Sequence, residues 1–264
     1  MDMPQHGEIL SNSVLLDEYR KIEFYAPEIC AKTCPGQFVH VKIASLQDRI
    51  LRRPFSICDV NTAGTLTVVY KVVGEGTSVL ARLKAGDVCD LMGPLGNPFS
   101  PCAADELPVI VAGGYGSAAT YILARSCAAS GILLLGARSE NDLILTDKFK
   151  EAGFEVRVST QDGSVGHKGL VTELIEPVIR ENPGRKLRFY GCGPHGMLMA
   201  LGRMLTGMGL DGELSLDHLM CCGVGACFAC VVKVKDDNAD GWRYARTCKE
   251  GPVFAASKVY YGDN

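Results

Sequence analysis

Short runs of apolar residues dominate the first hundred residues of the chain, and polar or turn-forming residues separate them. Runs rich in Val, Ile, Phe and Tyr, bounded by Gly, Pro, Asp and Asn, are typical of β-strands. They predict strands within 13–27, 36–44, 53–60 and 64–73. One helix only is expected among them, at 76–86, where apolar residues recur at helical spacing and Gly86 ends the run. The pattern predicts a small antiparallel β-barrel.

After residue 108 the pattern changes to strands that alternate with amphipathic helices, and 97–108 is expected to be a linker. Alternation of this kind, with short turns, predicts βαβ units and a parallel sheet. The predicted strands are 108–114, 132–139, 155–160 and 186–193, and the predicted helices are 117–131, 146–153, 168–182 and 195–209.

The fold class is therefore expected to be an α+β multi-domain chain. The expected divisions are an antiparallel β-barrel over 1–100, a parallel α/β domain of the nucleotide-binding type over 101–213 and a small cysteine-rich domain over 214–264.

Composition narrows the function class. The chain has 264 residues, of which 47% are hydrophobic and 22% charged, and its formal net charge is −3. This balance is that of a core-forming protein, with no nucleic-acid footprint and no run long enough to cross a membrane. Twelve cysteines and no export signal predict a reducing, cytoplasmic setting, where close cysteines are metal or redox sites before they are disulfides.

The last segment holds the most specific motif, C-x4-C-x2-C followed after seventeen residues by a fourth cysteine. This is the plant-type [2Fe–2S] spacing. The predicted ligands are Cys222, Cys227, Cys230 and Cys248. Gly223 and Gly225 allow a backbone with positive φ to approach the cluster closely, so that its N–H groups stabilise the negative charge.

The position of the fourth ligand follows from a predicted hairpin. Strand-like runs at 231–235 and 242–247 flank a turn, and closing the hairpin there brings Cys230 and Cys248 side by side. Cys221 is expected not to be a ligand. A four-cysteine zinc site is the alternative, although zinc usually takes paired C-x2-C knuckles and one such pair is present.

Two weaker signals point to a flavin. Arg53 can grip a phosphate through its planar guanidinium, and Ser56 can hydrogen-bond the flavin ring edge. Gly76 and Thr77 open the predicted helix, where a glycine-rich N-terminus suits a pyrophosphate. The alternatives are a solvated arginine and an ordinary N-cap at Thr77.

The predicted parallel sheet offers two further turns. Gly113, Gly114 and Gly116 lie between its first strand and helix, where such sheets contact the phosphates of NAD, although the spacing is not G-x-G-x-x-G. Cys192 ends the fourth strand and is a candidate neighbour of a nicotinamide and a flavin. A buried cysteine in a tight turn is the alternative.

The order of these motifs, "RPFS", "AGGYG", "GCGP" and "CGVGACFAC" with "EGPVF" after it, resembles the ferredoxin–NADP reductase superfamily. Within it, the chain resembles the electron-transfer subunits of class 1B dihydroorotate dehydrogenase. The resemblance implies the same four cysteine ligands. It also implies FAD contacts at Arg53, Pro54, Phe55, Ser56, Tyr70, Lys71, Val72, Gly76 and Thr77. One departure is that Ala118 and Ala119 stand where the family commonly has prolines, which puts the nucleotide phosphate site in question.

The implied function belongs to pyrimidine biosynthesis. A separate FMN-bearing catalytic subunit would oxidise dihydroorotate, and this chain would pass the electrons through [2Fe–2S] and FAD to NAD+. The expected assembly is a heterotetramer with two copies of each subunit. No nucleophile–base arrangement stands out in the sequence, so no catalytic residue is predicted.

Three alternatives stay open. One is a related NAD(P)H:ferredoxin or sulfide-type flavin oxidoreductase subunit. Another is an oxygenase reductase, for which the cysteine-rich segment is short. The third is a zinc-stabilised binding module without a redox role.

Overall fold

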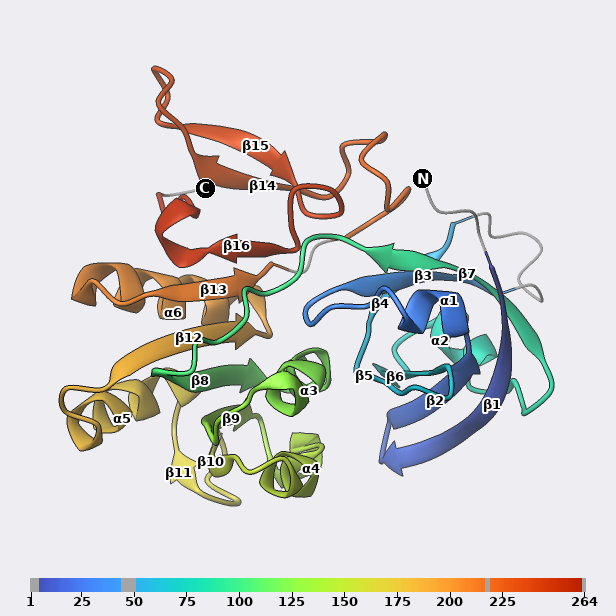
Figure 1. Ribbon diagram of the computed structural model, residues 1–264, viewed down its shortest axis with the longest axis horizontal. Coiled ribbons are helices and arrows are strands. Elements are labelled where there is room, and N and C mark those ends of the chain that lie inside the picture. Colours follow the sequence, from blue (N-terminus) through green and yellow to red (C-terminus); the bar gives the residue numbers. More distant parts are fainter. Residues whose placement is uncertain (1–4, 44–50, 217–218, 263–264) are drawn as a thin grey trace.

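The computed structural model describes residues 5–43, 51–216 and 219–262, and it contains two seven-stranded sheets and a two-stranded hairpin (Figure 1). The first sheet is antiparallel, in the order β4-β3-β7-β1-β2-β6-β5. Its strands are β1 (Gln5–Leu16), β2 (Tyr19–Tyr25), β3 (Phe38–Lys42), β4 (Arg53–Ser56), β5 (Asp59–Val60), β6 (Thr65–Lys71) and β7 (Val88–Leu95).

This sheet curls around its own apolar core. The rings of Phe55 on β4 and Tyr70 on β6 lie 5.9 Å apart, although these strands are far from each other in the sheet order. No strand pairing between β4 and β5 is recorded among the described residues, so the hydrogen bonds show a curled antiparallel sheet.

Two expectations for this region were wrong. Its described residues form two helices, α1 (Pro27–Cys30) and α2 (Glu75–Leu80), where one was expected. Pro27 occupies the first turn of α1, where its fixed φ and missing N–H are tolerated. Helix α2 ends well before Gly86, whose φ of +90° instead forms the turn into β7, a strand that the sequence pattern did not predict.

The second sheet has the order β11-β10-β9-β8-β12-β13-β16. Its strands are β8 (Glu106–Gly113), β9 (Ile132–Ala137), β10 (Glu155–Thr160), β11 (His167–Lys168), β12 (Lys186–Cys192), β13 (Gly212–Ser215) and β16 (Val253–Ala255). Six strands are parallel, but β16 runs antiparallel to β13, so the sheet is mixed rather than purely parallel.

Helices cover both faces of this sheet. The helices are α3 (Gly116–Ser126), α4 (Thr146–Glu151), α5 (Ile175–Glu181) and α6 (His195–Met208). Buried side chains of α5 and α6 pack on one face, and those of α3 and α4 pack on the other. Every residue of β8 is buried, which explains its continuous apolar run.

The expected C-terminal hairpin is confirmed. It consists of β14 (Val231–Lys235) and β15 (Trp242–Arg246), and Val231 pairs with Arg246. The segment from residue 97 to β8 is firmly attached, because the Asn97 backbone N–H donates to Gly251 O at 2.6 Å and the Ser100 hydroxyl donates to Glu213 at 2.7 Å. In the part of the chain that the structure describes, none of the helices has the length and apolar character needed to cross a membrane.

Candidate functional site

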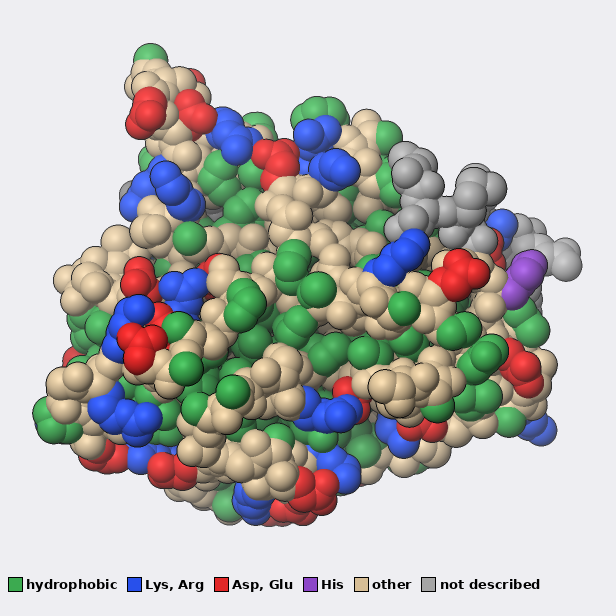
Figure 2. Space-filling view, in the orientation of Figure 1, with side chains coloured by type: hydrophobic (Ala, Val, Ile, Leu, Met, Phe, Trp, Pro, Cys, Tyr) green, Lys and Arg blue, Asp and Glu red, His purple; other side chains and the backbone are tan. Residues whose placement is uncertain are grey.

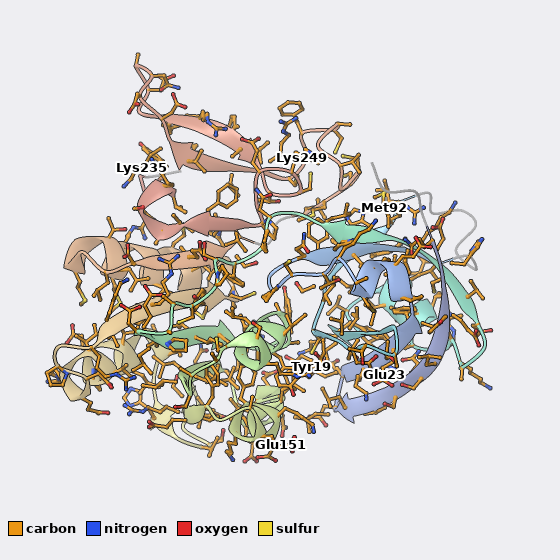
Figure 3. All side chains as sticks on the ribbon, viewed as in Figure 1. Tyr19, Glu23, Met92, Glu151, Lys235 and Lys249 are labelled. Carbon is orange, nitrogen blue, oxygen red and sulfur yellow. The ribbon has the colours of Figure 1, made fainter. Side chains whose placement is uncertain are left out.

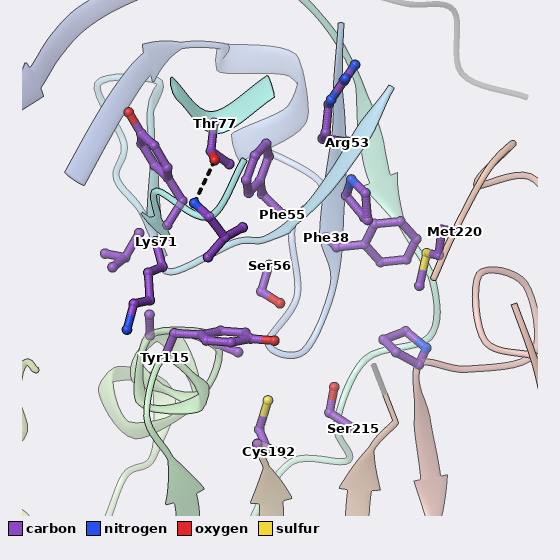
Figure 4. A pocket seen from close by; sticks show the side chains of 18 residues that line it. Phe38, Arg53, Phe55, Ser56, Lys71, Thr77, Tyr115, Cys192, Ser215 and Met220 are labelled. Atoms are coloured by element: carbon purple, nitrogen blue, oxygen red, sulfur yellow. Dashed lines mark hydrogen bonds between the residues drawn. The ribbon is translucent and has the colours of Figure 1, made fainter. Parts of the chain in front are cut away.

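A cavity of about 360 Å³, here called the central cavity, lies between the two sheets (Figure 4). Strands β4 and β6 and the start of α2 form one wall, while the start of α3 and the carboxyl ends of β12 and β13 form the other. The carboxyl edge of a parallel sheet is where such folds bind ligands. Predicted flavin-contacting residues that line this cavity are Arg53, Pro54, Phe55, Ser56, Tyr70, Lys71 and Thr77, and Cys192 joins them.

The first turn of α2 packs under Arg53. A Cβ at Gly76 would lie 2.5 Å from Arg53 Nε, so the absence of a side chain lets the guanidinium lie against the turn. The N-cap of α2 is Gly74 rather than Thr77, and the Thr77 hydroxyl instead accepts the N–H of Val73 at 2.9 Å. The arrangement holds a cation beside the N-terminus of a helix, which is chemistry suited to a diphosphate.

Two predicted flavin contacts do not line the central cavity. Gly76 lies behind Arg53, and Val72 packs against the core of the first sheet, whereas its neighbour Val73 lines the cavity. Ala118 and Ala119, which stand where the resemblance implies prolines, are buried and line the central cavity. They therefore lie among the predicted flavin contacts, and an effect of the replacement on the nucleotide phosphate site stays a prediction.

A second cavity of about 570 Å³, here called the outer cavity, follows the carboxyl ends of β8, β9 and β10 and the start of α6. Gly113 and Gly114 line it, but Gly116 does not. A Cβ at Gly116 would lie 2.1 Å from the carbonyl oxygen of Cys192, so this glycine allows α3 to pack against the end of β12. The glycine-lined edge fits a dinucleotide.

The two cavities adjoin. Lys71, Val73 and Tyr115 line both of them. Figure 3 labels Tyr19 where the two sheets meet, and its hydroxyl donates to Asp142 Oδ1 at 2.9 Å. Burial and the hydrogen bond to Asp142 raise the pKa of Tyr19, so it remains a donor at neutral pH. A ligand in one cavity is thus within reach of a ligand in the other.

The cysteine loop, residues 220–230, has the backbone that its glycines predict, because φ is +70° at Gly223 and +83° at Gly225. The Cys222 sulfur accepts backbone N–H groups of Val224 at 3.5 Å and Ala226 at 3.3 Å. Burial raises the pKa of Cys222, but these hydrogen bonds and one with Cys227 outweigh it and lower the pKa to about 6. The loop favours a thiolate before any metal binds.

The other two predicted ligands form a second pair. Because of the hairpin register, the backbone N–H of Thr247 donates to Cys230 O at 2.8 Å. Cys248 follows Thr247 directly, so Cys230 and Cys248 are neighbours. Both are buried, and desolvation together with Cys230 raises the pKa of Cys248 to about 12. We call Cys222 with Cys227 the outer pair and Cys230 with Cys248 the inner pair.

This pairing fits a [2Fe–2S] cluster. Such a cluster would be held by four cysteine thiolates, two from the outer pair and two from the inner pair, and would supply one-electron transfer. A four-cysteine zinc site needs all its sulfurs around one ion. Among the described sulfurs, the main interactions are those of Cys222 with Cys227 and of Cys248 with Cys230, with a weaker electrostatic effect of Cys222 on Cys248.

A buried apolar contact joins the inner pair to the central cavity. Phe38 and Met220 pack with Cys230 and Cys248, and the same two side chains line the central cavity. Figure 4 shows Phe38 beside Met220 at the cavity wall. We call these two residues the bridge. Sequence reasoning missed both, because a phenylalanine in a strand and a methionine before a cysteine carry no local signal of this role.

His40 was also missed. It is fully buried on β3, and burial with the nearby Arg52 lowers its pKa to about 4. A Cβ at Gly223 would lie 2.6 Å from the imidazole, so the ring lies directly against the cysteine loop. The alternation of β3 places His40 on the same face as Phe38, a signal that was available in the sequence.

The opposite side of the cysteine loop faces solvent. Phe228 is 61% exposed with a φ of +56°, and Leu219 is 77% exposed. The Arg246 guanidinium lies 4.9 Å from the centre of the Phe228 ring and donates to Gly225 O at 2.8 Å. Figure 2 shows hydrophobic side chains beside Lys and Arg at this end of the molecule. An exposed aromatic ring in a left-handed backbone conformation is uncommon and indicates an interaction surface.

Comparisons with known proteins agree with this geometry. Residues 217–260 match the family model "Iron-sulfur cluster binding domain of dihydroorotate dehydrogenase B", and residues 11–99 match "Oxidoreductase FAD-binding domain". A solved structure of an NADH-dependent reduced ferredoxin-NADP oxidoreductase superposes with a TM-score of 0.83 at 28% identity, covering 99% of this chain and 92% of that one. A ferredoxin NADP+ reductase from Neisseria gonorrhoeae, 18% identical with a TM-score of 0.63 and covering 79% of this chain and 93% of its own, shares the fold.

Curated relatives match over most of the chain. The electron transfer subunit of dihydroorotate dehydrogenase B (NAD(+)) from Fusobacterium nucleatum is 41% identical over 231 residues, which cover 85% of this chain and 86% of the relative. The subunit of the same name from Desulforamulus reducens is 38% identical, covering 91% of this chain and 92% of the relative. This chain therefore belongs to the family of electron transfer subunits of NAD(+)-dependent dihydroorotate dehydrogenase B.

Proposed function

We propose that this chain takes electrons from the catalytic subunit of a dihydroorotate dehydrogenase and delivers them to NAD+, as a step of pyrimidine biosynthesis. The observation that carries the proposal is the bridge, since one pair of apolar side chains contacts both the inner cysteine pair and the central cavity. Bound FAD supplies both one-electron and two-electron chemistry, and a [2Fe–2S] cluster supplies one-electron transfer.

The chain's own residues hold and shield these groups. Arg53 and the start of α2 are proposed to bind the FAD diphosphate, and Ser56 and Cys192 to face the flavin ring across the central cavity. The outer cavity, with Gly113 and Gly114, is proposed to bind NAD+. Phe38 and Met220 are 3% and 6% exposed, so water is excluded between the flavin site and the inner pair. The pyrimidine would not touch this chain.

The partner would dock on the solvent-facing side of the cysteine loop. The partner proposed is an FMN-containing catalytic subunit, in an assembly with two copies of each subunit. Residues 219–230 carry no charged side chain, and Phe228 and Leu219 project from this surface. Exposed aromatic residues at the centre of an apolar patch are common anchors of interfaces.

Two structural proposals accompany the function. The first sheet is proposed to close into a barrel. The contact between Phe55 and Tyr70, whose strands lie near opposite edges of the sheet, supports this proposal. The functional divisions are proposed as 1–100, 101–213 and 214–264, with β16 as a strand that the last part contributes to the sheet of the second.

The test is a visible spectrum of the anaerobically purified protein before and after addition of NADH. Flavin and iron–sulfur bands that both bleach would support the whole route. Cofactor bands that do not respond to NADH would contradict the assignment of the outer cavity, and a colourless protein containing zinc would contradict the redox function.

A further inference from the structure

His40 is an unexplained polar group in the interior. Its side chain is fully buried on β3, and neither ring nitrogen has a hydrogen-bond partner among the described residues. Buried polar side chains in native proteins are nearly always hydrogen-bonded. A neutral imidazole still has one N–H to donate. Its position therefore calls for an acceptor that the described part of the chain does not provide.

The surroundings of His40 indicate where that acceptor is. The ring lies against Gly223, which directly follows Cys222, and a Cβ at Gly223 would meet imidazole carbon and nitrogen atoms between 2.6 and 2.9 Å away. The Phe38 ring, part of the bridge, lies 5.7 Å from the imidazole. His40 thus occupies the buried side of the cysteine loop, between the loop and the first sheet.

The side chains around His40 are already engaged elsewhere. Arg52, which lies near it, donates to Asp90 Oδ2 at 2.7 Å and to Asp90 O at 2.9 Å. In the strand ladders, His40 is paired with Pro54 and Met92, which offer no side-chain oxygen. Within residues 5–43, 51–216 and 219–262, the imidazole is therefore left without an acceptor.

A second orphaned group flanks the same loop. The hydroxyl of Thr247 is buried without a partner among the described residues, and Thr247 directly precedes Cys248. Five buried side-chain atoms lack partners there, and three of them belong to His40 and Thr247. Two of the four side chains with such atoms thus lie beside the cysteine loop or next to a predicted ligand.

We propose that His40 donates a ring N–H hydrogen bond to a sulfur atom of the [2Fe–2S] cluster held by the four cysteines, and so acts as a positioning residue. The proposal rests on the proposed function, because it requires the cluster. Donors to cluster sulfurs stabilise the added negative charge of the reduced state, and such outer contacts tune the potential of a metal centre. His40 would therefore make the cluster easier to reduce by the partner subunit.

The experiment measures the cluster midpoint potential of the purified holoprotein by spectroelectrochemical titration, with iron content as a check. His40→Leu, which keeps the bulk and removes the N–H, is expected to lower the equilibrium constant for cluster reduction about tenfold, or about 59 mV for one electron. His40→Gln restores a donor and is expected to recover part of the shift. His167→Leu, at an exposed histidine that contacts Glu173, is the matched control and should leave the potential unchanged.

Two results would overturn the proposal. One is a His40→Leu protein with full iron content and the wild-type potential. The other is an equal shift in His40→Leu and His40→Gln, since packing rather than the N–H would then be responsible.

A measurement on protein that retains His40 keeps the proposal testable if the His40 variants do not fold. Holoprotein labelled with 15N-histidine and reduced with dithionite should show a weak hyperfine coupling from one imidazole nitrogen in pulsed magnetic resonance. As a control, labelled His218→Gln protein must retain that coupling, because His218 is the histidine nearest to the cysteine loop in the sequence. Absence of any coupling would overturn the proposal, whereas absence of the cluster itself would overturn the proposed function.

Discussion

The outer and inner cysteine pairs use the same residue type in opposite surroundings. Cys222 is partly exposed in a glycine-rich loop whose N–H groups stabilise its thiolate, whereas Cys248 is 3% exposed and packs against Phe38 and Met220. Because of this difference, the two sides of the site are not equivalent. The outer pair faces the surface on which a partner would dock, and the inner pair faces the central cavity.

The largest expected effect comes from breaking the inner pair. Cys248→Ser should abolish NAD+-coupled orotate formation by the reconstituted complex, because one iron would lose a thiolate. The catalytic subunit should still reduce artificial acceptors, which a dye assay measures. Cys221→Ser is the control and should keep the coupled activity. Coupled activity that survived in Cys248→Ser would show that Cys248 is not a ligand.

The pKa difference between the pairs should appear in protein stripped of its cluster. Cys222, with a pKa of about 6, is mostly thiolate at pH 7, and Cys248, with a pKa of about 12, is almost entirely thiol. Because the thiolate is the form that reacts, iodoacetamide should modify Cys222 increasingly as the pH rises through 6 and leave Cys248 unmodified. Tandem mass spectrometry locates the label, and equal labelling of the two residues would contradict the difference in pKa between them.

Loss of the bridge should affect both stability and electron transfer. Met220→Ala removes a buried side chain and should lower the free energy of unfolding by about 2–5 kcal/mol, measured by denaturant titration. It should also slow reduction of the cluster by NADH in stopped flow. Met220→Leu, close to isosteric, should restore the stability. An unchanged rate of cluster reduction in Met220→Ala would show that the bridge is not the route.

Binding of FAD should depend on the charge of a basic side chain, whereas the cysteine loop contains no basic or acidic residue. Arg53→Ala should weaken FAD binding by about 1.5–3 kcal/mol, the usual cost of losing a hydrogen bond to a charged group. Fluorescence titration of deflavinated protein measures the affinity. Arg82→Ala removes an arginine that does not line the central cavity and should have no effect. Unaltered FAD affinity in Arg53→Ala would contradict the assignment of the diphosphate site.

The smallest effect is expected at the docking surface. Phe228→Ala should weaken binding of the catalytic subunit by more than about 1 kcal/mol, a roughly fivefold change in Kd or more. Stability should change little, because the ring is exposed and its backbone is in an unfavourable conformation for a large side chain. Tyr244→Ala, at another exposed aromatic residue on the hairpin, is the comparison. Equal effects of both substitutions in calorimetry would argue against Phe228 as an anchor.

Local patterns were sufficient for the parts of the molecule that depend on near neighbours. Cysteine spacing, glycines at 223 and 225 and the hairpin register required only short-range geometry, and φ values and strand pairing agree with the predictions. The alternation of strands and helices in the second sheet was equally local. The strand β7 escaped prediction, because Cys89, Asp90 and Gly93 interrupt its β-like pattern.

The sequence by itself identified the residues whose chemistry suits the expected cofactors. They are four cysteines at iron–sulfur spacing, an arginine in a strand that resembles a flavin-binding one, and glycines at the turns of a parallel sheet. Tertiary structure alone decided how they are connected. It placed Phe38 and Met220 between the inner pair and the central cavity, set His40 against Gly223, and brought β16 into the second sheet. Phe38 and His40 lie well over a hundred positions from Met220 and Gly223, and β16 pairs with β13 across the cysteine loop and the hairpin. Tertiary packing and strand pairing rather than local propensity fix these contacts.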